Sequence, residues 1–194
     1  LLAYLGLIAK WNKVYNLTAV REPAQMLTHH LVDCLAAVPP LRRALAGVEQ
    51  AEPALLDVGA GAGLPGVVFA ILHPHLRVDC VDTVAKKAAF VQQVAVELKL
   101  ANLRGLHARV ESLESGYDVV SSRAFASLVD FTRWSRQALR PGGVWLAMKG
   151  REPHDEIAAL PESVMVFHVE HLRMPGLDAE RCIVWMRPAT EPLP

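Results

Sequence analysis

DVGAGAGLPG, residues 57–66, places four glycines in ten positions directly after the apolar run of residues 54–56. In open α/β sheets, ligands bind outside the carboxyl ends of the strands, commonly at the loop after the first strand. Glycine in such a loop permits backbone conformations closed to other residues and lets the bare backbone approach a ligand. The stretch therefore predicts a strand, a ligand-binding loop and a nucleotide-like ligand.

A carboxylate ends the next strand-like run, VDCVD. Asp82 follows Gly59 by 23 residues, where a carboxylate can accept hydrogen bonds from both hydroxyls of an adenosine ribose. Gly61, Gly63 and Gly66 also satisfy the dinucleotide spacing G-x-G-x-x-G. The spacing leaves NAD and S-adenosylmethionine both open, and a tight turn that needs glycine only for packing is the structural alternative.

Short β-type runs alternate with helical segments between residues 54 and 149, which is typical of a parallel sheet covered by helices. After Gly150, a short helix near residues 154–160 precedes two strand-like runs, SVMVFHVEHL and CIVWM. No long helix separates these two runs, so we expect an antiparallel pair at the sheet edge. The fold class predicted is α/β, with a Rossmann-like sheet.

The first 50 residues have the pattern of a helical extension. Leu2, Leu5, Ile8 and Ala9 recur at helical spacing, and residues 26–35 repeat the pattern. Pro39–Pro40 is expected to end this second helix. At 194 residues we expect a single domain, 1–194, in which 1–50 form the extension and 51–194 the catalytic core.

Composition sets limits on the partners. Apolar residues make up 52% of the chain, so a packed globular protein is expected, and 20 basic side chains balance 20 acidic ones. RNA binding would therefore rest on local patches. The basic residues that could form such a track are Lys10, Lys13, Arg21, Lys86, Lys87, Arg133, Arg136 and Arg140. Three widely spaced cysteines and no long apolar run predict a soluble, cytoplasmic protein.

Seven motifs in order carry a family resemblance: WNKVYNLTAVREP, HHLVDCL, LLDVGAGAGLPG, KLANL, SRAFASL, LAMKG and ERCIVWMR. Over nearly its whole length the chain resembles the bacterial small-subunit rRNA guanine methyltransferases known as RsmG or GidB. The resemblance implies a class I methyltransferase fold, S-adenosylmethionine as donor and 7-methylguanosine in 16S rRNA as product. The implied partner is 16S rRNA or the small ribosomal subunit, with no membrane and no obligate protein partner.

The resemblance also implies a donor site. The positions that match the family's glycine loop and cofactor contacts are Gly59, Gly61, Gly63, Leu64, Val110, Glu111 and Arg123. Asp82 and Thr83 would face the ribose. His30 and Asp33 would tie the helical extension to the catalytic core.

Arg123, after the fourth strand, is the strongest catalytic candidate. Its planar fork can hold the carboxylate of the donor or the oxygen and ring edge of guanine. The structural alternative is an arginine that ends a strand in an ion pair. Lys149 and Arg181 are weaker candidates for holding RNA phosphate or orienting the base.

The acceptor chemistry follows partly from what these strand ends lack. An imidazole nitrogen of guanine has a lone pair and no proton to lose, so its attack on a methyl group needs no general base. Amine acceptors are commonly met by an Asn/Asp-Pro-Pro-aromatic stretch after the fourth strand, where this chain has SSRAF. A pyrimidine-carbon acceptor needs a cysteine nucleophile in a Pro-Cys loop, which the sequence does not contain. Purine nitrogen chemistry is favoured.

Three other interpretations stay open at this stage. An NAD-dependent oxidoreductase would need a proton-relay side chain, for which the sequence has no constellation. A non-catalytic RNA-binding module would keep the nucleoside pocket without turnover. His29, His30 and Asp33 have one-turn spacing for a metal, but there is no third histidine nearby in the sequence, so no metal is expected.

Overall fold

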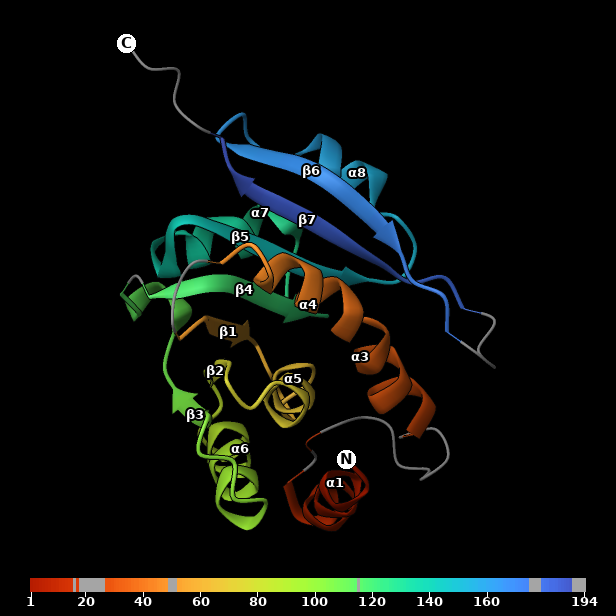
Figure 1. The fold of residues 1–194 in the computed structure, drawn as a ribbon, viewed down its shortest axis with the longest axis vertical. Coiled ribbons are helices and arrows are strands. Elements are labelled where there is room, and N and C mark those ends of the chain that lie inside the picture. Colours follow the sequence, from red (N-terminus) through yellow and green to blue (C-terminus); the bar gives the residue numbers. More distant parts are fainter. Residues whose placement is uncertain (16, 18–26, 49–51, 115, 175–178, 190–194) are drawn as a thin grey trace.

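The computed structural model describes residues 1–15, 17, 27–48, 52–114, 116–174 and 179–189, and centres on one seven-stranded sheet (Figure 1). The strands are β1 (Ala54–Val58), β2 (Arg77–Asp82), β3 (Leu103–His107), β4 (Tyr117–Arg123), β5 (Leu139–Lys149), β6 (Val164–His171) and β7 (Cys182–Pro188). Their order is β3-β2-β1-β4-β5-β7-β6. The first five are parallel, and β7 runs antiparallel between β5 and β6. The predicted α/β sheet and antiparallel C-terminal pair are confirmed.

Helices cover both faces of the sheet, as Figure 1 shows. They are α1 (Leu2–Tyr15), the π-helix η1 (Leu27–Val32), α3 (Asp33–Ala36), α4 (Val38–Leu45), α5 (Gly66–Leu72), α6 (Ala85–Glu97), α7 (Leu128–Ser135) and α8 (His154–Ala158), with 3-10 turns η2 (Val110–Ser112) and η3 (Arg136–Ala138). Among these described helices, none is both long and apolar enough to cross a membrane.

Two hydrophobic clusters hold the layers together. Ile8, Leu41 and Phe90 pack with Leu55 of β1 in one cluster, so the N-terminal helices share a core with α6 and the sheet. Leu56 of the same strand packs with Phe131 of α7 in the other. Successive side chains of a strand face opposite sides, and both sides of β1 are covered. All five residues of β1 are therefore buried.

Two details of the helical extension differ from expectation. The second helix ends at Ala36, shortly before Pro39–Pro40, but these prolines lie in the first turn of a further helix, α4. Proline fits there because the first N–H groups of a helix have no intrahelical partner. In α1 the buried residues are Tyr4, Leu7, Ile8 and Asn12, whereas Leu2 is 77% exposed. The predicted stripe was thus partly wrong, because Tyr4 and Asn12 were left out of it.

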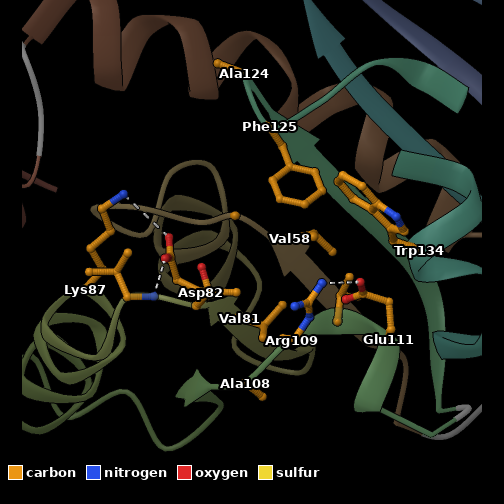
Figure 2. A pocket seen from close by; sticks show the side chains of 14 residues that line it. Val58, Val81, Asp82, Lys87, Ala108, Arg109, Glu111, Ala124, Phe125 and Trp134 are labelled. Carbon is orange, nitrogen blue, oxygen red and sulfur yellow. Dashed lines mark hydrogen bonds and ion pairs between the residues drawn. The ribbon is translucent and has the colours of Figure 1, made fainter. Parts of the chain in front are cut away.

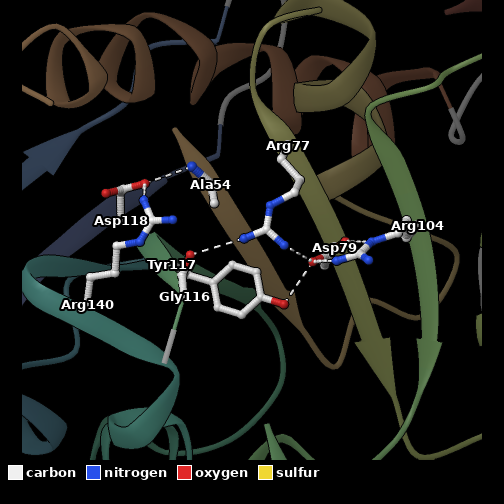
Figure 3. A network of polar contacts seen from close by, with 8 residues as sticks. All are labelled: Ala54, Arg77, Asp79, Arg104, Gly116, Tyr117, Asp118 and Arg140. Atoms are coloured by element: carbon white, nitrogen blue, oxygen red, sulfur yellow. Dashed lines mark hydrogen bonds and ion pairs between the residues drawn. The ribbon is translucent and has the colours of Figure 1, made fainter. Parts of the chain in front are cut away.

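A polar network lies at the amino-terminal ends of the parallel strands (Figure 3). Asp79 is fully buried and accepts hydrogen bonds from Nε and Nη2 of Arg104, both at 2.7 Å, and from the hydroxyl of Tyr117 at 2.8 Å. Nearby, Arg140 Nη1 donates to Asp118 Oδ2 at 2.7 Å. Arg140 is engaged at the edge opposite the glycine loop, which removes it from the proposed basic track on the ligand side.

Candidate active site

The glycine loop joins the carboxyl end of β1 to α5 and presents bare backbone. Gly59 and Gly61 have φ values of +65° and +59°, a region that L side chains rarely adopt. A Cβ added to Gly61 would meet nothing nearer than the Gly59 carbonyl oxygen at 4.0 Å, so the space beside Gly61 is open. A ligand can therefore approach the backbone at this position.

Asp82 holds this loop from the end of β2. Its Oδ2 accepts a hydrogen bond from Gly61 N at 3.0 Å, and its Oδ1 accepts one from Val84 N at 2.9 Å. The ammonium group of Lys87 lies 3.8 Å from Oδ2. The carboxylate is mostly buried. Asp82 thus positions the loop as well as presenting acceptors to a ligand.

The loop is also held from the far side by α1. The buried hydroxyl of Tyr4 donates to the carbonyl oxygen of Ala62 at 2.6 Å. Burial is the first cause that raises the pKa of Tyr4 well above its usual value, so the phenol stays protonated and donates. The first helix of the chain thereby fixes a loop 58 residues away.

Asp57, inside β1, anchors the start of α5. Its Oδ2 accepts from Gly66 N at 2.9 Å, and its Oδ1 lies 2.9 Å from the Ser121 hydroxyl of β4. A Cβ on Gly66 would lie 2.4 Å from Cys80 Sγ, so only glycine lets the helix come this close. Complete burial raises the pKa of Asp57 to about 7, although both hydrogen bonds oppose the shift.

The raised pKa of Asp57 predicts how stability depends on pH. In the unfolded chain an aspartate titrates near about 3.9. Between about pH 4 and pH 7 the folded state keeps a proton that the unfolded state releases, so this contribution to stability is lost as pH rises through that window. Asp57→Asn mimics the protonated carboxyl and lacks this slope. Urea unfolding across pH should show wild-type stability falling relative to the variant; parallel curves would refute the shift.

A cavity of about 410 Å³ opens beyond the loop (Figure 2). We call it the donor pocket, because it contains several of the residues that the sequence predicts for donor binding. Its polar end has Asp82, Thr83 and Lys87, and its apolar part includes Val110 and the rings of Phe125 and Trp134, whose centroids are 5.8 Å apart. The other lining residues are Val58, Gly59, Val81, Val84, Ala108, Arg109, Glu111 and Ala124. A polar end beside an apolar slot suits a ribose joined to an aromatic base.

Arg123 and Phe125 diverge at the end of β4. Ala124 between them has a φ of +53°, rare for a residue with a side chain. Phe125 lines the donor pocket, whereas Arg123 lines the loop pocket, a cavity of about 120 Å³ beside Gly59, Gly61 and Leu64. The turn therefore sends the two large side chains on either side of Ala124 to different cavities.

Arg123 is bound to the helical extension. Its Nη1 donates to Asp33 Oδ2 at 3.0 Å, and Arg181 Nε donates to Asp33 Oδ1 at 2.9 Å. The three side chains are mostly buried, and they join α3, the end of β4 and the start of β7. The predicted tie through Asp33 is present, as is the ion pair named as the structural alternative for Arg123.

Comparison with known proteins identifies the family. The sequence model of the family described as GidB, rRNA small subunit methyltransferase G, matches residues 1–184. The chain belongs to the GidB family. The Ribosomal RNA small subunit methyltransferase G of Acidovorax sp. (strain JS42) is 68% identical over 193 residues, which cover 97% of this chain and 85% of that protein. The protein of the same name from Polaromonas naphthalenivorans (strain CJ2) is 65% identical over 192 residues, covering 98% and 86%.

The fold recurs in solved structures of low identity. A SAM-dependent methyltransferase from Aquifex aeolicus superposes with a TM-score of 0.58 at 13% identity, covering 85% of this chain and 98% of that one. Such a likeness concerns the fold alone. It confirms that this GidB-family chain has the class I methyltransferase architecture predicted from its sequence.

The structure distributes the predicted donor residues over two adjoining cavities. Gly59, Asp82, Thr83, Val110 and Glu111 line the donor pocket. The predicted residues beside the loop pocket are Gly59, Gly61, Leu64 and Arg123. Gly63, in the same loop, lines neither cavity and faces α5, where a Cβ would come within 2.4 Å of the Val67 side chain. In this GidB-family chain Gly63 therefore serves packing of the loop against α5.

The two weaker catalytic candidates are both held by carboxylates. Lys149 Nζ donates to both carboxylate oxygens of Glu156 at 3.0 and 2.8 Å. Glu156 Oε2 also accepts from Leu128 N, the first residue of α7. Arg181 is bound to Asp33, as described above. Lys149 therefore has a structural role in joining β5, α7 and α8, and it also lines the cavity that Arg181 and Arg123 line.

Sequence reasoning missed several residues of the site. The sequence predicts no role for Asp57 beyond its place in the glycine motif. It predicts no role for Phe125, Trp134 or Glu156. An aspartate within a fully buried strand was the one available signal, because buried carboxylates need partners. Within the described ranges, no group of three or more His, Cys, Asp or Glu is placed to hold a metal ion; the side chain of His29 lies outside what the structure describes.

Replacing Asp82 tests its two roles. Asp82→Ala removes the acceptor for Gly61 N and any acceptor offered to the ribose, and the loss of charged hydrogen bonds costs roughly 1.5 to 3 kcal/mol. We expect S-adenosylmethionine to bind about 10- to 150-fold more weakly in calorimetry. Asp79→Asn, at the opposite edge, is the control that changes a buried carboxylate outside the pocket. An unchanged donor affinity for Asp82→Ala would remove it from the site.

Proposed function

We propose that this protein transfers a methyl group from S-adenosylmethionine to guanine in 16S rRNA and so forms 7-methylguanosine. The family match over residues 1–184 carries the proposal. It is supported by relatives named Ribosomal RNA small subunit methyltransferase G at 65–68% identity over most of both chains. The NAD-dependent oxidoreductase left open by the glycine spacing has no such support.

The cavities suit the donor. Asp82 and Thr83 would hold the ribose, and Val110, Phe125 and Trp134 the adenine ring. The guanidinium of Arg123 would hold the methionine carboxylate at the loop pocket, where the open space beside Gly61 lets the ligand come close. When bound, S-adenosylmethionine supplies a methyl group on a cationic sulfur, which leaves as a neutral thioether when a lone pair bonds to the methyl carbon in line. No metal enters this proposal.

The chain's own contribution is alignment and exclusion of water. Attack by guanine N7 needs no base, and the buried carboxyls of this site are already committed to protein partners, Asp57 to Gly66 N and the Ser121 hydroxyl. The three cysteines are buried, and burial raises the pKa of the Cys34 thiol to about 12, so a thiolate nucleophile has no place here. Purine nitrogen methylation is the chemistry that these residues fit.

The substrate would be 16S rRNA, naked or in the small ribosomal subunit, and the site of action the cytoplasm where ribosomes assemble. Lys10, Lys13, Lys86 and Lys87 are basic side chains of α1 and α6 that remain candidates for phosphate contacts. With a net charge of zero, such contacts are local and affinity for RNA should fall as salt rises.

Mass spectrometry of nucleosides tests the function. Small ribosomal subunits from a strain lacking this enzyme, and protein-free 16S rRNA, would each be incubated with enzyme and donor. The expected product is 7-methylguanosine in one of the two substrates. Calorimetry in parallel should show binding of S-adenosylmethionine and of its demethylated product, but not of NAD. Donor binding without any methylated nucleoside would favour the non-catalytic RNA-binding module instead.

A further inference from the structure

A third cavity lies beside the donor site. We call it the Arg181 cavity: a space of about 630 Å³ bordered by Asp33, Arg123, Met148, Leu172, Arg181 and Cys182. It opens at the carboxyl ends of β4 and β5 and the start of β7. Its volume is in the range of small-molecule sites.

The Arg181 cavity adjoins both donor cavities. Arg123 and Ala124 line it and also line the loop pocket, and Ala124 reaches the donor pocket as well. The turn at Ala124 is therefore where the three spaces meet. A group held in the Arg181 cavity lies next to the loop that would hold the reactive end of the donor.

The walls of the Arg181 cavity have a definite chemistry. Met148 and Leu172 supply apolar surface for a flat ring. Asp33 has each oxygen occupied by an arginine, at 3.0 Å by Arg123 and at 2.9 Å by Arg181, so the wall offers mainly donors. Arg181 uses Nε for Asp33 and Nη1 for the Glu180 carbonyl, and within the described part of the chain its Nη2 group has no protein partner. Two guanidinium groups face one carboxylate.

Resting on the proposed function, we infer that the Arg181 cavity receives the acceptor purine and that Arg181 selects guanine by donating to its O6. Base-modifying enzymes act on a nucleotide taken out of its stack, which requires a pocket of this kind. On that edge guanine presents two acceptors, O6 and N7, whereas adenine presents the N6 amine beside N7. An N–H group that donates to O6 leaves the N7 lone pair of guanine available for methyl transfer. In adenine the same N–H group would face the N6 amine, which is also a hydrogen-bond donor.

Asp33 is then a positioning residue. It does not touch the base but fixes both guanidinium groups, from positions 90 and 148 residues distant in the chain. In Asp33→Asn one oxygen becomes an amide donor, so one arginine loses its acceptor. Arg181→Lys keeps the charge and removes the planar fork.

Single-turnover kinetics on small ribosomal subunits, at saturating donor, tests these roles. We expect Asp33→Asn and Arg181→Lys each to slow transfer at least about tenfold, since small misplacements of positioning groups have effects of this size. For Arg181→Lys, which lies outside both donor cavities, the donor Kd should stay within about threefold of wild type. Arg173→Lys and Asp155→Asn, both exposed and outside the cavity, are matched controls that should transfer at the wild-type rate. Wild-type rates in both cavity variants would overturn the inference.

Nucleosides added as competitors test the recognition of O6. With donor saturating, guanosine and inosine, which both carry O6, should inhibit transfer at least about tenfold more strongly than 2-aminopurine riboside, which lacks it. In Arg181→Lys the three nucleosides should inhibit about equally. A merely structural role of Arg181 would not change the relative inhibition by the three nucleosides. Equal inhibition by all three, or none at the solubility limit, would contradict the assignment. If wild-type enzyme itself transfers no methyl group, the proposed function fails; if only these variants behave as wild type, the cavity assignment fails alone.

Discussion

Arg123→Ala is expected to slow methyl transfer by about 100- to 1000-fold at saturating donor, the effect of removing one preorganised charged group from an active site. Arg123 stands where the loop pocket and the Arg181 cavity meet, with its guanidinium mostly buried. Arg123→Lys should recover little, because an ammonium group cannot reproduce a planar fork. The measurement is a single-turnover rate at a temperature where each variant is fully folded.

A stability effect accompanies this substitution. Arg123 donates to the buried Asp33, so its loss should lower the free energy of unfolding by about 1–3 kcal/mol. Arg140→Ala is the matched control: it breaks a comparable ion pair with Asp118 at the far edge of the sheet. Arg140→Ala should lose similar stability and keep its transfer rate. If both variants lose activity in proportion to stability, Arg123 is only a strand-end ion pair.

Gly59→Ala is expected to weaken donor binding by about 10- to 100-fold. A side chain at a φ of +65° costs about 1–2 kcal/mol, and the new Cβ would lie 2.2 Å from Cδ2 of Phe125. Phe125 must then move, and its ring is part of the donor pocket wall. Calorimetry with S-adenosylmethionine measures the effect, and Gly6→Ala, in an open position of α1, is the control expected to bind normally.

The double variant Gly59→Ala/Phe125→Ala separates the two causes. Truncating Phe125 removes the clash but leaves the backbone strain, so the two substitutions should be non-additive in donor affinity. The double variant should bind the donor somewhat more weakly than Phe125→Ala does. The difference in binding free energy should be no larger than the cost of the strained backbone at position 59. Strict additivity would show that Phe125 does not pack over Gly59 in solution.

Local patterns predicted the frame of the fold well. ALLDV formed β1, VDCVD formed the end of β2, and the alternation behind them built the parallel sheet. These elements are set by short-range periodicity and by glycine and aspartate at strand ends. Pro39–Pro40 misled because proline is compatible both with the end of one helix and the start of another, and only the tertiary packing of α4 decides.

The site was less accessible to such reasoning. Asp82 was found from its spacing, but the contacts of Asp33 with Arg123 and Arg181 join three separate segments that no period connects. The direction in which the Phe125 side chain points depends on the φ of +53° at Ala124. Alanine rarely has a positive φ, so its presence in the sequence does not predict such a turn. Long-range ion pairs and single unusual dihedral angles leave no mark in composition or spacing.

The order in which a ribosome makes this chain gives the bond between Asp33 and Arg181 a further meaning. Asp33 is synthesised first, and its partner Arg181 follows 148 residues later, just before β7. Contacts so distant in sequence form slowly and only after the intervening chain is available. A nascent chain that has already made the donor loop still lacks Arg181 and β7, so the Arg181 cavity cannot close around a base. Methyl transfer should therefore begin only after Arg181 and β7 have been synthesised.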